Sequence, residues 1–297
     1  MHITNQKKYT KPTIPTNDEY LEVWTFKNSC LTEGDCKSNL YFPIKLIGSG
    51  SIGNIFMANA FGGYPCAIKR FKTTDAHLID LSLDGHKHLK NISSPYLMKI
   101  SGIYSEPRAI SMELLNGTDA NSIRYDLKIN DIISIMHDIC KALELLNVEG
   151  LVHRDIKPSN IFLIENNPTK LVDYDMLIRE GSKQKKGVIL GTPLYMSPEQ
   201  VAGKSLNHKS DIYSLAISIF ELILDTKFPQ AFFTEGTVNE VFNARIRNRM
   251  NLPLQWCSNI PKWLLASLLS CVSMSPDNRP TAVDLIDIIN KNHKDNL

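Results

Sequence analysis

One string decides how this chain folds and where its chemistry lies: His153-Arg154-Asp155-Ile156-Lys157-Pro158-Ser159-Asn160. A second string, Asp173-Tyr174-Asp175, begins thirteen residues after Asn160. The carboxylate of Asp155 can accept a proton, and Lys157 brings a positive charge beside it. Oxygen atoms such as those of Asn160 and Asp173 are the ligands that hard divalent cations prefer. Together the two strings suit the metal-assisted transfer of a negatively charged group.

These strings resemble the catalytic and metal-binding motifs of the eukaryotic-type (Hanks-type) serine/threonine protein kinase family. The resemblance implies that Asp155 accepts the proton of the attacking hydroxyl and that Lys157 neutralises the transferred phosphoryl group. It also implies that Asn160 and Asp173 hold Mg²⁺, or Mn²⁺, on ATP. Asn160 follows Asp155 by five residues and Asp173 follows it by eighteen, which is the spacing the resemblance requires. A lysine at position 157 resembles the serine/threonine branch rather than the tyrosine branch.

A glycine-rich segment with the pattern Gly-x-Gly-x-x-Gly lies between two strand-like runs, at Gly48, Gly50 and Gly53. Glycine allows a backbone to approach phosphate groups closely. Lys69, in the string Cys66-Ala67-Ile68-Lys69, then stands where the family has its phosphate-binding strand lysine. The other nucleotide contacts that the resemblance implies are Ile47, Ile55, Ala67 and Phe162 around adenine, the backbone of Glu113 and Leu115, and Asp119 at the ribose. Each of the apolar residues would suit a hydrophobic core equally well.

The segment Gly191–Glu199 resembles the loop that faces the protein substrate, and the resemblance implies that Thr192 bridges Asp155 and Lys157. Glu199 and Arg279 resemble a buried ion pair that braces this part of the fold. Asp211 resembles the aspartate that anchors the backbone of the catalytic loop. The motifs occur in the family's order across residues 41–288, with Thr192 counted among the catalytic residues and the other three as structural.

The resemblance implies an α+β, two-lobed protein kinase fold, and a β-rich first third joined to a helical remainder fits it. We expect an extension over 1–39, a β-rich N-lobe with one main helix over 40–115, a mostly helical C-lobe over 116–288 and a polar tail over 289–297. Short β-rich runs punctuated by glycine predict strands at 42–47, 52–58, 65–71, 97–104 and 109–114. Helical periodicity predicts helices at 74–91, 130–147, 210–224, 240–247, 261–271 and 281–291.

The first predicted helix departs from the family pattern. No glutamate occurs between Lys69 and Glu106, and Gly85 occupies the position where the family has the glutamate that pairs with its strand lysine. Asp80 and Asp84 lie on one helix face as the nearest acids, and the sequence leaves open which of them, if any, pairs with Lys69 in its place. Because glycine also lowers helix propensity, we hypothesise that this helix is mobile or shifted until nucleotide, substrate or an activating protein partner organises it.

Two further positions bear on regulation. Asp-Tyr-Asp replaces the family's Asp-Phe-Gly, which keeps the metal ligand Asp173 and places Tyr174 where phenylalanine is usual. Arg154 before the catalytic aspartate implies control by phosphorylation of the following loop. Ser182 is the one serine or threonine between Asp173 and Gly191, and its basic neighbours would either bind a phosphate or form a solvated loop.

The composition of the chain bears on whether nucleic acid or a membrane is a partner. Apolar residues make up 43% of the chain, charged residues 22%, and the net charge is +2. This balance gives no reason to expect nucleic acid as a partner. The longest apolar run, 215–224, is too short to span a bilayer, so no membrane insertion is expected.

The cysteines and the start of the chain bear on its location. The six cysteines lack metal-site spacing and are expected to be free thiols in a reducing compartment. The first eight residues have no apolar core typical of a secretory signal. A cytoplasmic protein is expected, the alternative being a protein delivered into another cell.

The leading interpretation is a serine/threonine protein kinase that phosphorylates protein hydroxyls and itself with ATP. The alternative is a pseudokinase-like scaffold that binds nucleotide and acts through protein partners, which the glycine at position 85 favours. A small-molecule kinase is a third interpretation. Thr192 and the Ser-Pro-Glu string at 197–199 count against it, because they look suited to a peptide hydroxyl.

Overall fold

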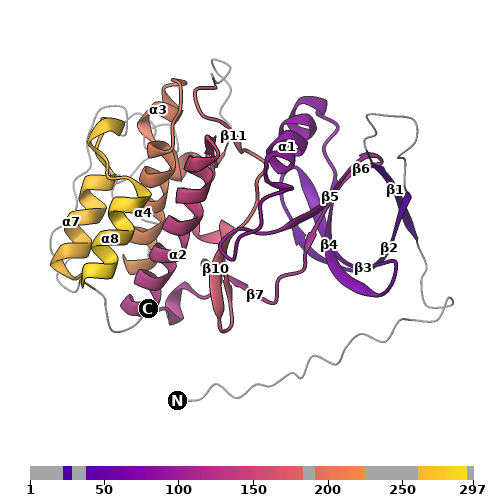
Figure 1. Ribbon diagram of the computed structural model, residues 1–297, viewed down its shortest axis with the longest axis horizontal. Coiled ribbons are helices and arrows are strands. Elements are labelled where there is room, and N and C mark those ends of the chain that lie inside the picture. Colours follow the sequence, from indigo (N-terminus) through magenta and orange to yellow (C-terminus); the bar gives the residue numbers. More distant parts are fainter. Residues whose placement is uncertain (1–22, 29–37, 183–190, 225–259, 293–297) are drawn as a thin grey trace. The chain divides into compact units, whose positions relative to one another are not determined.

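The computed structural model describes residues 23–28, 38–182, 191–224 and 260–292, which divide into two compact units (Figure 1). The first unit contains the chain up to Leu83 and the segment Ile100–Leu114. The second contains Asp84–Lys99 and the chain from Leu115 onward. A β-rich unit and a mainly helical unit confirm the α+β fold class expected from the sequence. The helix expected at 240–247 lies outside the described residues.

The first unit is a closed six-stranded barrel with strand order β1-β2-β3-β4-β6-β5. All of its strand pairs are antiparallel. Helix α1 (Ala76–Leu89) follows β4, and its last six residues are counted with the second unit. The strands are β1 (Trp24–Asn28), β2 (Ser38–Ser49), β3 (Gly53–Ala60), β4 (Tyr64–Phe71), β5 (Ile100–Glu106) and β6 (Arg108–Glu113).

Strand β1 closes the barrel, because it pairs with β2 on one side and with β5 on the other. It lies within the residues that the sequence predicted to be an extension. Trp24 and Phe26 are buried while Thr25 between them is exposed, the alternation expected of a strand with one face on a core. This segment is therefore part of the folded first unit.

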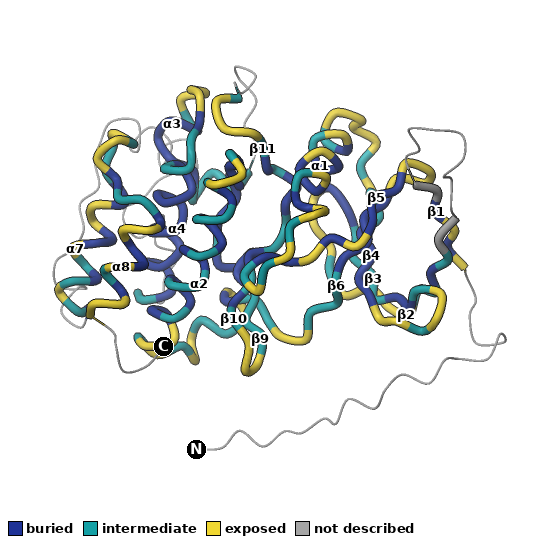
Figure 2. The backbone as a smooth tube through the Cα atoms, in the orientation of Figure 1, coloured by how far each residue is buried: buried dark blue, intermediate teal, exposed yellow. Residues whose placement is uncertain are grey.

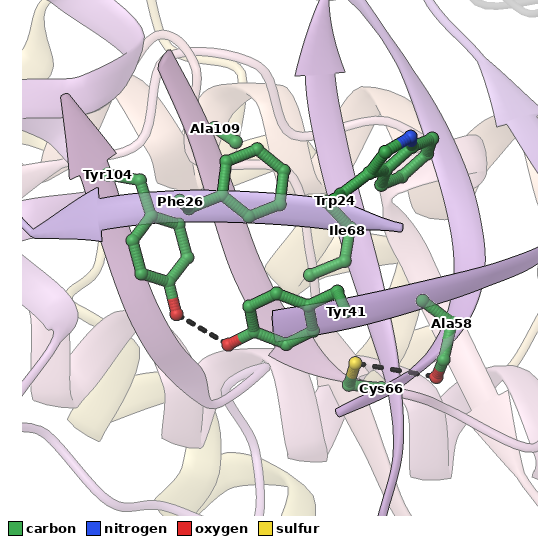
Figure 3. Close-up of a cluster of buried hydrophobic side chains, with 8 residues drawn as sticks. All are labelled: Trp24, Phe26, Tyr41, Ala58, Cys66, Ile68, Tyr104 and Ala109. Carbon is green, nitrogen blue, oxygen red and sulfur yellow. Dashed lines mark hydrogen bonds between the residues drawn. The ribbon is translucent and has the colours of Figure 1, made fainter. Parts of the chain in front are cut away.

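An aromatic cluster fills the interior of the barrel (Figure 3). The ring of Phe26 stacks on Tyr104 with 5.1 Å between centroids, and the hydroxyls of Tyr41 and Tyr104 lie 2.5 Å apart. The Cys66 thiol donates to the carbonyl oxygen of Ala58 at 3.4 Å. Burial raises the pKa of Cys66 to about 11, so this thiol is neutral and serves as core.

The second unit is organised around α2 and α4, whose inward faces are buried (Figure 2). Its helices are α2 (Ile129–Val148), α3 (Pro198–Val201), α4 (Lys209–Leu224), α7 (Lys262–Cys271) and α8 (Ala282–Asn292). Its short strands are β7 (Gly117–Asp119), β8 (Leu151–Val152), β9 (Ile161–Ile164), β10 (Asn167–Leu171) and β11 (Ile178–Arg179). Strands β10, β9 and β7 form one sheet, and β11 pairs with β8. The apolar run at 215–224 is thus the C-terminal part of a core helix.

Across the ranges that the structure describes, no helix combines the length and apolar character needed to cross a membrane.

Candidate active site

The loop after β8 is anchored by one buried carboxylate on α4. Asp211 accepts the backbone N–H of His153 at 2.7 Å through Oδ2 and that of Arg154 at 2.9 Å through Oδ1. Arg154 has φ of 70°, a conformation that residues other than glycine rarely adopt. Burial raises the pKa of Asp211 to about 7, although both N–H donors lower it. The anchoring role expected of Asp211 has the geometry that it needs.

The carboxylate of Asp155 accepts hydrogen bonds from three donors. Oδ2 accepts from Nζ of Lys157 at 2.7 Å and from Nδ2 of Asn160 at 3.1 Å, while Oδ1 accepts the backbone N–H of Thr192 at 2.9 Å. Lys157 also donates to Oγ1 of Thr192 at 2.8 Å. Thr192 therefore contacts both residues that it was predicted to bridge. An ionised carboxylate has about four acceptor positions, so Asp155 keeps room for one more donor.

His153 is held as a neutral ring. Its Nδ1 lies 3.3 Å from the backbone N–H of Asp155, which makes Nδ1 an acceptor, and its Nε2 lies 3.3 Å from the carbonyl oxygen of Val172. The proton of the neutral ring is thus on Nε2. Burial lowers the pKa of His153 to about 4, because a charged ring would lose its hydration, and the carboxylates of Asp155 and Asp173 offset this only in part.

The Asp-Tyr-Asp string follows β10 and turns sharply. Asp173 has φ of 66°, and the next side chain, Tyr174, is fully buried. The Tyr174 hydroxyl donates toward the carbonyl oxygens of Met98 at 3.1 Å and Leu171 at 2.9 Å. Its ring meets that of His153 edge to face, with centroids 5.8 Å apart. The hydroxyl that distinguishes tyrosine from phenylalanine is therefore satisfied inside the core.

Asn160 and Asp173 carry the oxygen atoms predicted to hold a divalent cation. The amide nitrogen of Asn160 is used by the carbonyl and carboxylate oxygens of Asp155, so its Oδ1 is the atom left to act as a metal ligand. Asp173 supplies a carboxylate that is only partly buried. The described residues contain no group of three or more His, Cys, Asp or Glu that could hold a metal ion. A two-residue donor set fits Mg²⁺, which takes its remaining ligands from phosphates and water.

The loop before α4 is braced by the ion pair expected between Glu199 and Arg279. Nη1 lies 2.6 Å from Oε1 and Nη2 lies 2.8 Å from Oε2, and both residues are buried. Burial alone would raise the pKa of Glu199, but the hydrogen bonds and charge of Arg279 and the hydroxyl of Ser210 outweigh it, and the pKa is lowered. Glu199 is therefore ionised at neutral pH.

The glycine-rich turn joins β2 and β3 in the first unit. The N–H of Gly50 donates to the carbonyl oxygen of Gly53 at 2.9 Å and closes the turn. A Cβ at Gly53 would lie 2.7 Å from the carbonyl oxygen of Arg70, whereas one at Gly48 or Gly50 would have no contact closer than 3.7 Å. Packing thus explains the glycine at position 53 but leaves the other two available for a close approach by a ligand.

Three of the predicted nucleotide contacts lie on one face of the barrel wall. Ile55 pairs with Lys69 across β3 and β4, and Ala67 is two residues before Lys69 on the same strand. Both Ala67 and Lys69 are buried, while Ile47 is 44% exposed near the end of β2. Glu113 is the last residue of β6.

The remaining predicted contacts belong to the second unit. Strand β7 places Asp119 opposite Phe162 on β9. The Asp119 carboxylate accepts the backbone N–H of Ser122 at 3.0 Å and its hydroxyl at 2.6 Å, which fixes a local turn. Leu115 begins the second unit, directly after the end of the first.

Asp80 and Asp84, the acids of α1 considered as partners of Lys69, each form an ion pair with another residue. Asp80 pairs with Arg108 at 3.2 Å, and Asp84 pairs with Lys87 one turn away at 2.9 Å. Both carboxylate side chains are more than half exposed, whereas Lys69 is buried. Both acids therefore interact with other cations on the exposed surface of the helix.

The guanidinium of Arg154 is buried and only partly satisfied. Its Nε donates to the carbonyl oxygen of Met176, but Nη2 has no hydrogen-bond partner among the described residues. Burial lowers the pKa of Arg154 to about 10, which leaves it charged at neutral pH. Ser182, the predicted phosphorylation site, donates its N–H to Arg179. Lys183, Lys185 and Lys186, predicted to surround it, lie outside the described residues.

Sequence reasoning missed one buried acid in this unit. Glu221, on α4, accepts the hydroxyl of Tyr195 at 2.5 Å and lies 3.5 Å from Nη1 of Arg124. Because Tyr195 belongs to the substrate-side loop, this contact ties the loop to the core helix. A carboxylate inside an otherwise apolar run was the signal that could have found it.

Comparison with known proteins gives a family and several relatives. The model of the family described as "Protein kinase domain" matches residues 41–288. The chain is 29% identical over 276 residues to Serine/threonine-protein kinase A of Synechocystis, and 26% identical over 276 residues to Tyrosine-protein kinase MasK of Myxococcus xanthus. It is 27% identical over 254 residues to Serine/threonine-protein kinase max-2 of Caenorhabditis elegans. These alignments cover 82–84% of this chain but only 52%, 42% and 38% of the three relatives.

Proposed function

Since this chain belongs to the protein kinase domain family, we propose that it transfers the γ-phosphoryl group of ATP to serine and threonine hydroxyls of protein substrates. One observation carries the proposal: Asp155 is held by Lys157, Asn160 and Thr192 in a single hydrogen-bonded group. A carboxylate oriented in this way, with one acceptor position to spare, suits a substrate hydroxyl.

Asp155 and its neighbours have different roles in the proposed phosphoryl transfer. Asp155 orients the hydroxyl and takes up its proton, while Nζ of Lys157, 2.7 Å from Oδ2, brings positive charge to the transferred group. Thr192 holds that ammonium from the other side and places the substrate-side loop next to the base. Contributions of this kind are positional and electrostatic, which is what phosphoryl transfer requires.

Members of this domain family use ATP and a divalent metal, and we assign the metal here to Mg²⁺, with Mn²⁺ as a substitute. Asn160 and Asp173 would hold it, and it would supply charge neutralisation at the phosphate oxygens. In the first unit, Lys69 and the backbone at Gly48 and Gly50 would bind phosphates. The adenine contacts would come from Ile47, Ile55, Ala67, Phe162 and the backbone of Glu113 and Leu115, with Asp119 at the ribose.

Autophosphorylation at Ser182 is the regulatory part of the proposal. A buried arginine whose Nη2 has no hydrogen-bond partner in the described part of the chain is costly unless an anion completes it. A phosphate on the loop that contains Ser182 would supply that anion to Arg154. An activating protein partner is a separate proposal, which rests on the glutamate that α1 lacks. The buried free thiols Cys66, Cys140 and Cys271 favour a reducing, cytoplasmic location.

Intact-mass analysis after incubation with ATP and Mg²⁺ tests the activity. We expect the wild type to gain mass in steps of one phosphoryl group and to label a mixed serine, threonine and tyrosine peptide library on the first two residues. Asp155→Ala and Lys69→Met should abolish both signals. Asp287→Ala, an exposed aspartate on α8, is the matched control and should retain them.

The same experiment distinguishes an active kinase from a nucleotide-binding scaffold. Thermal stabilisation by ATP and Mg²⁺ without phosphate on the protein or on any peptide would contradict the kinase proposal and favour a nucleotide-binding scaffold. Labelling of tyrosine alone would overturn the assignment of serine and threonine. Mass gain that survives Ser182→Ala at full stoichiometry would remove Ser182 from the proposal.

A further inference from the structure

Helix α1 lacks the acid that the family uses at its centre, and its own two aspartates face other cations. The residue that stands in place of the acid is Gly85, which is buried. The second half of α1 belongs to the same unit as the Asp-Tyr-Asp segment, so the contacts between them can be followed residue by residue.

Gly85 lies against the backbone of that segment. A Cβ built on Gly85 would be 2.3 Å from the carbonyl oxygen of Tyr174 and 3.3 Å from that of Leu177. Real Cβ atoms essentially never come within 3.0 Å of another heavy atom, and a backbone carbonyl cannot rotate away as a flexible side chain can. The helix can occupy this position only because residue 85 has no side chain.

The backbone that Gly85 touches is a turn directly after the metal ligand. The N–H of Leu177 donates to the same Tyr174 carbonyl oxygen at 3.2 Å, which closes the turn over 174–177. His86, the neighbour of Gly85, is buried and meets the ring of Tyr174 edge to face with centroids 5.6 Å apart. Asp173, directly before this turn, has a left-handed conformation with φ of 66°.

We propose that Gly85 is a positioning residue. Its backbone packs on the turn Tyr174–Leu177 and, with His86, holds Asp173 in the orientation that metal binding needs, in place of an acid on α1. The catalytic consequence of this inference rests on the proposed function, whereas the packing of Gly85 on the turn is independent of it. Restoring the family's glutamate by Gly85→Glu should therefore harm the protein rather than improve it.

The test compares Gly85→Ala and Gly85→Glu with Asp84→Ala, an exposed neighbour on the same helix. Alanine favours a helix more than glycine does, so propensity alone predicts that Gly85→Ala raises the melting temperature. The contact with Tyr174 predicts the opposite sign. We expect both glycine variants to melt below the wild type and Asp84→Ala to melt with it.

A second readout reports on position rather than on stability. The Mg²⁺ concentration needed for half-maximal thermal stabilisation by ATP should rise about tenfold in Gly85→Ala, as is typical when a residue that supports a metal ligand is changed. Turnover is not required for this measurement. An unchanged Mg²⁺ requirement together with an unchanged or higher melting temperature would overturn the proposal.

A measurement on the wild type covers the case in which the variants do not fold. In hydrogen exchange, peptides containing the Leu177 amide and those from the second half of α1 should be protected and should lose protection together as denaturant is added. Unprotected exchange at 174–177 beside a protected α1 would contradict the docking of the helix. If the wild type is active and Gly85→Ala has an unchanged melting temperature and Mg²⁺ requirement, this inference alone is contradicted. If the wild type is inactive but Gly85→Ala needs more Mg²⁺, only the proposed function is contradicted.

Discussion

Arg279 and Glu199 form a two-pronged ion pair inside the second unit, with Nη1 2.6 Å from Oε1 and Nη2 2.8 Å from Oε2. The arginine also donates to the backbone carbonyl oxygens of Lys209 and Ser273. One guanidinium thus connects the substrate-side loop, the start of α4 and the segment before α8. Side chains that are this deeply buried and still charged depend on one another.

Removing one partner of this pair should be costly. Arg279→Met keeps much of the volume but leaves the Glu199 carboxylate buried without its cation, and we expect the free energy of unfolding to fall by about 3–5 kcal/mol in urea titrations. The exposed pair Asp84–Lys87 offers a control, since Asp84→Ala should cost less than about 1 kcal/mol. Equal losses in the two variants would mean that the buried pair contributes little.

The strand that closes the barrel gives a second prediction. Phe26 is fully buried and stacks on Tyr104 at 5.1 Å, so Phe26→Ala should lower the free energy of unfolding by about 3–5 kcal/mol. Thr25→Ala, on the exposed face of the same strand, is the matched control and should stay within about 0.5 kcal/mol of the wild type. If Phe26→Ala unfolds at the same denaturant concentration as Thr25→Ala, β1 is not part of the folded unit.

The strand and the catalytic loop differ in how far sequence could predict them. Asp155, Lys157 and Asn160 lie within six residues, and a loop of that length confines their side chains to one place. Strand β1 is five residues long, and β5, with which it closes the barrel, is distant in sequence. The alternation of its two buried aromatics, Trp24 and Phe26, does not show which edges the strand will join.

The acids of α1 show a different limit. Periodicity correctly placed Asp80 and Asp84 on one helix face, but it did not say which cation would be nearest. Lys87, three residues after Asp84, was a visible competitor at helical spacing. The contact of Gly85 with the Tyr174 carbonyl oxygen had no such signal, since a close backbone approach depends on where the helix lies in three dimensions.

Acid should destabilise the protein through His153. A histidine whose folded pKa of about 4 lies below its ordinary 6.5 takes up more protons in the unfolded chain between these values, so its contribution to stability is lost as the pH falls from 6.5 toward 4. In His153→Phe this contribution is absent. The opposing effect of Asp211, whose raised pKa of about 7 makes stability fall as the pH rises from about 4 to 7, remains in both proteins and cancels in the comparison.

The measurement is the free energy of unfolding of both proteins at pH 7.5 and at pH 4. The advantage of the wild type over His153→Phe should shrink by about 3 kcal/mol between the two. A difference that does not change with pH would show that the ring takes up its proton in the folded state as readily as in the unfolded chain.

The bridge from Thr192 to Lys157 gives the last prediction. Thr192→Val removes the oxygen that accepts from Nζ of Lys157 at 2.8 Å but preserves the shape of the side chain and the backbone N–H that Asp155 uses. A hydrogen bond to a charged group contributes about 1.5–3 kcal/mol, so kcat should fall roughly 10- to 100-fold. Thr192→Ser keeps the oxygen and should stay within about threefold of the wild type, while ATP-dependent thermal stabilisation should be the same in all three proteins. If valine and serine lower kcat equally, the methyl group of Thr192 matters and the bridge does not. If valine leaves kcat unchanged, Asp155 alone is enough to hold the Lys157 ammonium in place.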